Sequence, residues 1–131
     1  MRTVLTAAHL WDGTNLLDDP VVVVEDGLVS SISYRTASGS LPEGEVVSFA
    51  GATLAPAFFD VHIHGCAGHD LMEATPQALS AVGRFLATRG VGSYLATTVT
   101  ASMDETLKSL SGLAKLLSAP QAPGQAVIGN R

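Results

Sequence analysis

The residues after Leu54 alternate between strand and helix patterns, and this alternation constrains the fold more than any other feature of the sequence. Residues 58–64 are mostly apolar and favour a buried strand. Residues 91–99 form a second stretch of this kind, and residues 126–128 resemble the start of a third. Apolar residues recur at helical spacing in the two segments between them. This order predicts a parallel sheet with covering helices.

Helix-end signals mark both predicted helices. Thr75 is placed as the N-cap of the first helix, with Pro76 at its first position, and Gly90 follows its end. Ser102 and Glu105 have the spacing of a capping box that begins the second helix. The apolar face of the first helix would comprise Leu79, Val82, Phe85 and Leu86, and that of the second Met103, Leu107, Leu110, Leu113 and Leu117.

The first half of the chain has a different rhythm, with short strands joined by turns. A run of four valines, residues 21–24, is followed by Asp26-Gly27 and then by the alternating stretch 28–34. An Asp-Gly pair between two such runs predicts a β-hairpin, because both turn positions need a positive φ. Further strands are predicted over residues 3–9, 46–49 and 52–54. This half therefore predicts a small β-sandwich or barrel.

The chain is short for the architecture that its second half indicates. A complete (β/α)8 barrel needs about 250 residues and at least about 200, whereas this sequence has 131. Two strand–helix units cannot close a barrel, and a small parallel sheet leaves faces and edges uncovered. Charged residues make up only 15% of the sequence, so much of the surface is suited to being covered. We therefore expect the front portion of a larger α/β protein.

Composition excludes several classes of function. Seven basic and twelve acidic residues give a net charge of −5, without a basic cluster, which argues against nucleic acid and anionic membranes as partners. The single cysteine, Cys66, rules out an internal disulfide scaffold. The N-terminus lacks a signal-like apolar core, and no stretch approaches the roughly 20 apolar residues of a membrane span. We expect a cytoplasmic globular protein.

Asp60-Val61-His62-Ile63-His64 is the sharpest chemical feature. Residues two apart on a strand point the same way, so Asp60, His62 and His64 would project from one face. Two imidazoles at the C-terminal end of a parallel strand suit a divalent metal, and this is where barrel active sites assemble. Asp60 lies deeper and could instead support the ligands. The alternative is that both histidines are packed or solvated without a ligand.

The remaining candidates are weaker. Cys66 could be a ligand or a nucleophile, but nothing identifies a partner base, and a small buried thiol is the favoured interpretation. His69, Asp70 and Glu73 follow the strand and could touch a substrate, although a solvated loop or the start of a helix fits them equally well. We expect His9 to be structural or exposed.

Residues 54–65, Leu-Ala-Pro-Ala-Phe-Phe-Asp-Val-His-Ile-His-Gly, resemble the first barrel strand of the amidohydrolase superfamily, which typically reads Leu-x-Pro-Gly-Phe-Ile-Asp-x-His-x-His. Within that superfamily, residues 65–76 and the stretch Thr-Thr-Val-Thr at 97–100 resemble the N-acetylglucosamine-6-phosphate deacetylases. Ala57 and Phe59 depart from the usual glycine and isoleucine. Some members of this family lack the histidine pair and use one metal, whereas this chain keeps the pair.

The resemblance implies an incomplete (β/α)8 TIM-type barrel. Residues 54–131 would be its first two βα units, and residues 1–53 the N-terminal portion of a small β-sandwich. The implied reaction is hydrolysis of an amide in an amino-sugar phosphate, giving glucosamine 6-phosphate and acetate. His62 and His64 would be metal ligands, for zinc first, with iron, manganese or cobalt as alternatives. Intact members are commonly homodimers.

No catalytic residue is assigned by the resemblance, because the family's catalytic aspartate and later ligands would lie beyond Arg131. We therefore expect the chain alone to be inactive. Two alternatives remain open. One is another amidohydrolase, dihydroorotase-like or deaminase-like, and the other is a non-enzymatic metal-binding or partner-binding remnant.

Overall fold

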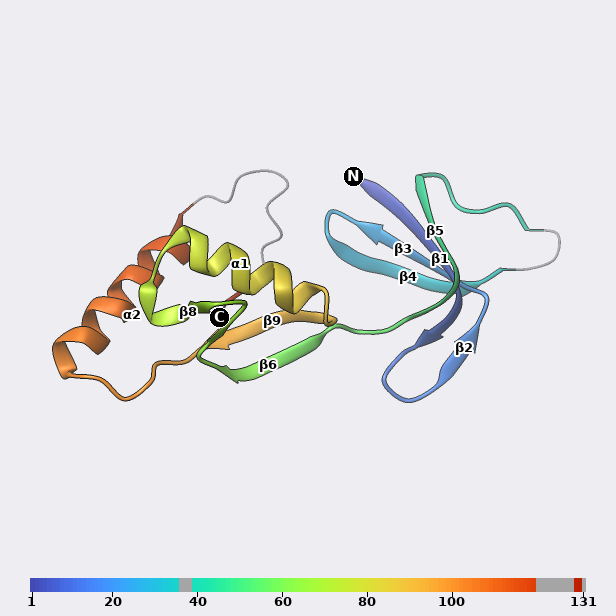
Figure 1. The fold of residues 1–131 in the computed structure, drawn as a ribbon. Helices are drawn as coiled ribbons and strands as arrows, with labels where there is room; N and C mark the ends of the chain where they lie inside the picture. The colour runs from blue at the N-terminus through green and yellow to red at the C-terminus, as the bar shows by residue number, and fades with distance from the viewer. Residues whose placement is uncertain (36–38, 120–128, 131) are drawn as a thin grey trace. The chain divides into compact units, whose positions relative to one another are not determined.

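The computed structural model describes residues 1–35, 39–119 and 129–130. The chain folds as two units, Met1–Pro56 and Ala57–Arg131 (Figure 1). The first unit is built from strands, and the second combines strands with helices. The prediction of a mixed α/β chain is thus confirmed. No helix in the described ranges is long and apolar enough to cross a bilayer.

The first unit is a five-stranded sheet in which the first strand pairs with three other strands. That strand pairs antiparallel with the second and third strands and parallel with the fifth, while the fourth pairs antiparallel with the third. The buried residues of the first strand are Val4, Thr6, Ala7 and Leu10, and most of the third strand is buried as well. The strands are β1 (Arg2–Trp11), β2 (Leu16–Asp18), β3 (Pro20–Glu25), β4 (Leu28–Tyr34) and β5 (Glu45–Leu54).

The predicted hairpin at Asp26-Gly27 is confirmed. Both turn residues have positive φ, 49° for Asp26 and 84° for Gly27, as a two-residue turn between right-twisted strands requires. Glu25 pairs with Leu28 directly across the turn. A bulge in β4, where the register shifts between Val23 and Val24 of its partner, changes the strict alternation of faces expected for this strand.

Two details of this sheet differ from the predictions. Residues 46–49 and 52–54, expected as separate strands, form one strand, β5, which continues through Gly51 at φ 76°. Its pairing with β1 shifts register between Ala7 and His9, where β5 advances four residues while β1 advances two. The short strand β2 was not predicted, because its three residues carry no run of β-branched side chains.

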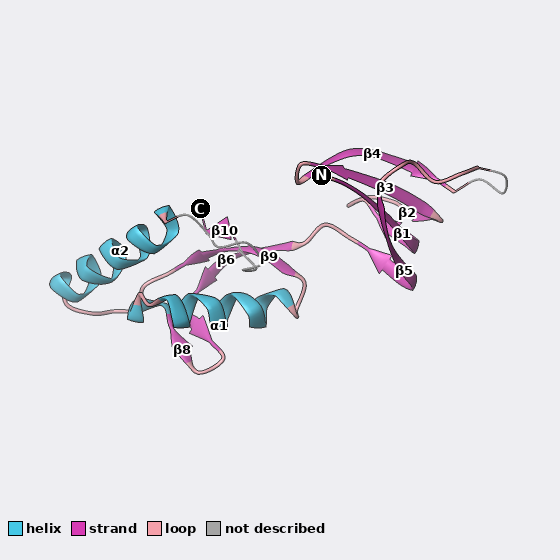
Figure 2. Cartoon of the chain, turned by 90° about the horizontal axis from the view of Figure 1, so that it is seen from above, coloured by secondary structure: helices cyan, strands magenta, loops and turns pink. Residues whose placement is uncertain are grey.

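The second unit follows a strand–helix–strand–helix–strand order. Its three parallel strands are β6 (Phe58–Ile63), β9 (Val91–Ala96) and β10 (Gly129–Asn130), with β9 in the middle. Helix α1 (Pro76–Ala87) connects β6 to β9 and lies along the sheet, and α2 (Met103–Ser118) follows β9 (Figure 2). The predicted third strand at 126–128 lies outside the described residues. A small hairpin, β7 (Gly65–Cys66) and β8 (His69–Asp70), and the 3-10 helix η1 (Leu71–Glu73) follow β6.

Both predicted helix starts are confirmed by their hydrogen bonds. The Thr75 hydroxyl accepts from the Ala78 N–H at 3.2 Å. The Ser102 hydroxyl accepts from the Glu105 N–H, and the Glu105 carboxylate accepts from the Ser102 N–H in return. A cap of this kind stabilises a helix by about 0.5–2 kcal/mol.

The core of the second unit lies between α1, η1 and the sheet. Leu71, Val82, Leu86 and Tyr94 are buried together, and Ile63 packs against them. Each fully buried side chain of this size contributes about 1.5–3 kcal/mol. The packing of Ile63 thus fixes the C-terminal end of β6, where the histidine pair lies.

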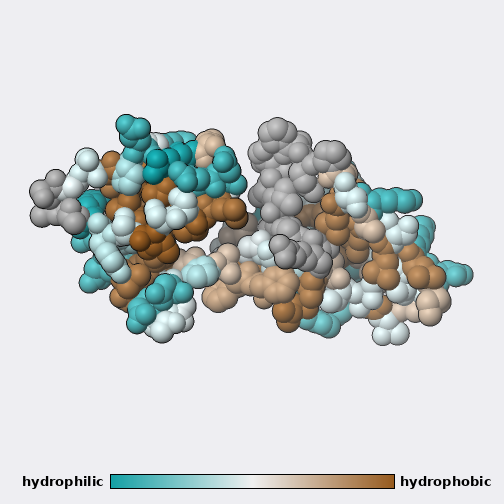
Figure 3. All heavy atoms as spheres, turned by 180° about the vertical axis from the view of Figure 1, so that it is seen from behind, coloured by the Kyte–Doolittle hydropathy of each residue, from teal (hydrophilic) through white to brown (hydrophobic). Residues whose placement is uncertain are grey.

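The strand expected over residues 58–64 forms, but the expectation that it is buried is wrong along its whole length, because none of its residues is buried. Phe58, Phe59 and Val61 are 70%, 51% and 62% exposed. Among the described residues β9 is the only strand paired with β6, and the core described above covers only part of the sheet. The predicted apolar face of α2 is likewise exposed at Met103 and Leu107. Figure 3 shows hydrophobic surface on both units.

Candidate metal centre

His62 and His64 lie at the C-terminal end of β6 with their rings turned toward each other. Their Nε2 atoms are 3.2 Å apart. The ring centroids are separated by 4.8 Å, and the ring planes cross at 81°. Both residues are exposed. The pair therefore presents two ring nitrogens to one point that solvent can reach.

A β-bulge shapes this end of the strand. Asp60 pairs with Tyr94 and Ile63 with Ala96, so β6 advances three residues while β9 advances two. Bulges of this kind redirect side chains and often occur beside functional sites. The strict alternation used in the sequence argument is therefore interrupted at the histidine pair.

Asp60 contacts the backbone of this bulge. Its Oδ1 accepts a hydrogen bond from the His62 N–H at 3.0 Å. Within the described residues, no three His, Cys, Asp or Glu side chains gather closely enough to hold a metal, so Asp60 does not form a three-residue cluster with the histidines. This contact agrees with the alternative in which Asp60 supports the candidate ligands and is not itself one.

Thr97 follows β9 and contacts the neighbouring strand end at three points. Its N–H donates to the Ile63 carbonyl at 2.9 Å. The His64 Nδ1 lies 3.1 Å from the Thr97 carbonyl oxygen and 3.2 Å from its hydroxyl oxygen. Sequence reasoning used Thr97 only as part of a motif and missed this contact. The signal available was its place just after the strand that pairs with β6.

The histidine pair fits a divalent metal geometrically. A tetrahedral zinc with bonds of 2.0–2.1 Å holds two ligand nitrogens about 3.3 Å apart, close to the 3.2 Å between these Nε2 atoms. The same distance also suits an N–H···N hydrogen bond between the rings when no metal is present. The described residues offer two candidate ligands, and a full coordination sphere needs others.

Cys66 has the features of a structural thiol. It packs against the core of the second unit, and its Sγ lies 4.0 Å from the Val82 carbonyl oxygen. Burial raises the pKa of the Cys66 thiol, and the negative charge of Asp60 raises it further. The thiol is therefore held in its protonated form, which favours the packing interpretation over the nucleophile.

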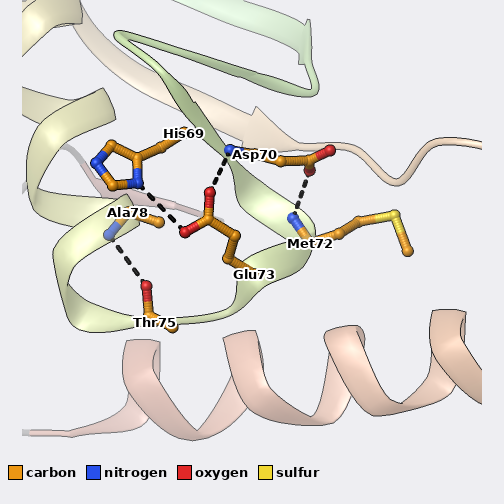
Figure 4. Close-up of polar contacts among 6 residues, drawn as sticks. All are labelled: His69, Asp70, Met72, Glu73, Thr75 and Ala78. Carbon is orange, nitrogen blue, oxygen red and sulfur yellow. Dashed lines mark hydrogen bonds and ion pairs between the residues drawn. The ribbon is translucent and has the colours of Figure 1, made fainter.

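Asp70 and Glu73 form a capping box that begins η1, and His69 contacts the Glu73 carboxylate (Figure 4). Glu73 accepts from the Asp70 N–H at 2.8 Å and lies 3.2 Å from the His69 Nδ1. Asp70 accepts from the Met72 N–H at 2.7 Å. The hydrogen bond from the Asp70 N–H and then the contact with His69 lower the pKa of Glu73. These contacts agree with the interpretation of the three residues as the start of a helix.

His9 lies far along the sequence from these residues, on β1. Its Nδ1 is 2.8 Å from the Asp18 carboxylate on β2, a cross-strand pair of the first unit. This agrees with the expectation that His9 is structural or exposed.

A cavity of about 800 Å3 lies between η1, helix α2 and the segment joining β9 to α2. Met72, Glu73, Val99 and Lys108 are among its lining residues, whereas His62 and His64 are not. Gly112 lets α2 approach η1 closely there, because a Cβ at that position would lie 2.7 Å from the Ala74 Cβ. The cavity therefore follows from helix packing beside the loop after β9.

Comparison with protein-family profiles finds no match. Among curated proteins, the chain is 33% identical over 130 residues to an N-acetylgalactosamine-6-phosphate deacetylase of Escherichia coli O157:H7, which covers 99% of this chain and 32% of that protein. It is 36% identical over 113 residues to an N-acetylglucosamine-6-phosphate deacetylase of Vibrio furnissii, covering 83% and 27%. The chain thus spans about a third or less of the length of these relatives.

Solved structures of deacetylases are also similar to this chain over most of its length. The N-acetyl-D-glucosamine-6-phosphate deacetylase of Mycobacterium smegmatis, in complex with N-acetyl-D-glucosamine-6-phosphate, matches 88% of this chain and 29% of its own, with a TM-score of 0.75 at 25% identity. The N-acetylglucosamine-6-phosphate deacetylase of Pasteurella multocida shares the fold over 95% of this chain and 32% of its own, with a TM-score of 0.80 at 19% identity. Over most of its length the chain thus matches N-acetylglucosamine-6-phosphate deacetylases of the amidohydrolase family, and it spans about a third or less of their length.

Proposed function

We propose that this chain supplies the first two metal ligands, His62 and His64, of an N-acetylglucosamine-6-phosphate deacetylase. The observation that carries the proposal is the 3.2 Å between their Nε2 atoms at the end of a parallel strand. The deacetylase names of the relatives support the reaction class, hydrolysis of the acetamide of an amino-sugar phosphate.

The metal would be divalent, with zinc first and iron, manganese or cobalt as alternatives. Such an ion supplies a Lewis acid for the acetyl carbonyl and a bound water of lowered pKa. The residues of this chain would hold and orient the metal site. His62 and His64 offer ring nitrogens to the ion, and Asp60 fixes the backbone of His62. The further ligands and the carboxylate that moves the proton would lie outside this chain, so we expect no turnover by the chain alone.

The architecture proposed for the complete protein is a (β/α)8 barrel with a small β-sandwich. Residues 54–131 would be the first two βα units, and residues 1–53 the N-terminal portion of the sandwich. Parallel pairing of β6, β9 and β10, with a helix after each of the first two, supports the barrel. The exposed Phe58, Phe59 and Val61 support it too, because closed barrels cover both faces of their strands.

Two properties of the complete protein extend this proposal. The substrate carries a phosphate, and charged groups cross bilayers at high cost, which supports a cytoplasmic location. A homodimer follows from the family resemblance.

A chimera tests the function. We would replace the matching segment of the Vibrio furnissii N-acetylglucosamine-6-phosphate deacetylase with this chain and measure acetate release from N-acetylglucosamine 6-phosphate. The proposal predicts release from the glucosamine substrate. Asparagine at both His62 and His64 should reduce this release by more than about 100-fold, because loss of the ligands themselves should exceed the 10–100-fold cost of losing residues that support a ligand.

His9→Asn is the matched control, because His9 pairs with Asp18 in the first unit. This variant should retain the activity of the parent chimera. A chimera that folds, as judged by circular dichroism, yet releases no acetate from the glucosamine substrate would contradict the proposal.

A further inference from the structure

We propose that Thr97 is a positioning residue that fixes the ring and the tautomer of His64. The proposal deepens the function given above and rests on it for the role of the histidine pair. Its starting point is the three contacts that join Thr97 to residues 63 and 64, two of which involve the His64 ring.

The hydrogen-bond chemistry of these contacts sets the tautomer. A main-chain carbonyl oxygen accepts hydrogen bonds and cannot donate them. The His64 Nδ1, 3.1 Å from the Thr97 carbonyl oxygen, must therefore carry the hydrogen and donate it. A neutral imidazole has one N–H, so Nε2 of His64 is left with a free lone pair. Metal-ligating histidines commonly donate their other N–H in this way.

The backbone around Thr97 holds this geometry in place. Its N–H donates to the Ile63 carbonyl at 2.9 Å, which continues the pairing of Ile63 with Ala96. On the other side, the His64 carbonyl accepts from the Leu71 N–H at 2.8 Å. The backbone of His64 is thus bonded to the start of η1, while its ring is bonded to Thr97.

The hydroxyl of Thr97 is the part that a substitution can remove. Its oxygen lies 3.2 Å from the same Nδ1 and offers a second acceptor to the His64 N–H. For His62, the ring contact that the described part of the chain records is the one with His64. In the metal-free chain, the His64 lone pair would accept from Nε2–H of His62. The two rings should then be opposite tautomers.

Two measurements on the full 131-residue chain test the proposal. The first is long-range 1H–15N NMR of the imidazoles at pH 8 with a chelator present. We expect the Nδ1–H tautomer at His64 and the Nε2–H tautomer at His62. The second is zinc affinity by calorimetry for Thr97→Val, which keeps the branched shape but loses the hydroxyl.

Thr97→Val should weaken zinc binding about tenfold, the lower end of the usual 10–100-fold range, because the main-chain carbonyl remains. Thr98→Val is the matched control and should bind zinc like the parent chain. Thr97→Ser restores a hydroxyl and should recover most of the affinity.

An Nε2–H tautomer at His64, or equal zinc affinity in Thr97→Val and the parent chain, would overturn the role of Thr97. A parent chain that binds no zinc would instead refute the proposed metal function, while the NMR spectrum still decides the tautomer. If Thr97→Val does not fold, the parent spectrum and the Thr97→Ser variant decide.

Discussion

The Nε2 atoms of His62 and His64 lie 3.2 Å apart although the two residues are two positions apart on one strand. Two such positions on a regular strand are separated by about 6.5–7 Å along the backbone, so the rings must lean toward each other to meet. The bulge in β6 and the hydrogen bond from the His62 N–H to Asp60 accompany this arrangement. The candidate site is thus a local distortion of a strand end.

The tight hairpin directly after His64 should depend on Gly65. This residue has φ 156°, and a Cβ there would overlap the His69 carbonyl oxygen. We expect Gly65→Ala to lower the free energy of unfolding by about 2–3 kcal/mol, because main-chain atoms cannot yield as a flexible side chain can. Urea unfolding at pH 7 measures this.

Gly68→Ala is the control for this prediction. Gly68 also has a positive φ, 81°, but an added Cβ would meet nothing within 4 Å. It should therefore lose only the backbone preference, about 1–2 kcal/mol. Equal losses in the two variants would show that the steric clash at Gly65 is absent.

Acid should weaken the capping box at η1 through Glu73. Hydrogen bonds from the Asp70 N–H and then His69 hold the pKa of Glu73 below its usual value of 4.5. A lowered pKa in the folded state stabilises the fold above the usual value, and this stabilisation is lost as the pH falls through the lowered one. Glu73→Gln should therefore be less stable than the parent chain at pH 7.

The urea midpoints of Glu73→Gln and the parent chain should converge as the pH is lowered from 5 toward 3. Glu43→Gln, which changes an exposed carboxylate in the first unit, should follow the parent curve throughout. A gap between Glu73→Gln and the parent that stays constant with pH would exclude the charge of Glu73 as its cause.

The two leucines of α2 should differ sharply in their contribution to stability. Leu113 is 5% exposed, whereas Leu107 is 56% exposed. Leu113→Ala should lower the free energy of unfolding by about 2–4 kcal/mol, and Leu107→Ala should change it by less than about 0.5 kcal/mol. Thermal unfolding followed by circular dichroism compares them. Similar losses would mean that the face around Leu107 is covered in solution.

The sequence correctly predicted the turns and helix ends whose formation depends on residues close together in the chain. The Asp26-Gly27 turn requires two positive φ angles, and Thr75 and Ser102 cap helices through residues three positions away. Such signals act within one turn of the chain, so a single sequence carries them. The alternation of strand and helix in the second half follows from periodicity in the same way.

What the sequence could not predict depends on contacts between distant residues. The continuity of β5 depends on pairing with β1, some 40 residues earlier. The exposure of Phe58 and Phe59 depends on what covers the sheet, which composition does not reveal. For the candidate site, the His-x-His spacing predicted the pair, but the contact of His64 with Thr97 spans 33 positions and needed the fold.

Zinc binding by the 131-residue chain tests the central claim most directly. Isothermal titration calorimetry should show one zinc per chain for the parent and for the His9→Asn control, because the two imidazoles offer nitrogens at the spacing of zinc ligands and water can fill the remaining positions. Asparagine at both His62 and His64 should abolish this binding while leaving the circular dichroism spectrum unchanged. Equal zinc binding by the parent chain and the doubly substituted chain would contradict the assignment of His62 and His64 as metal ligands.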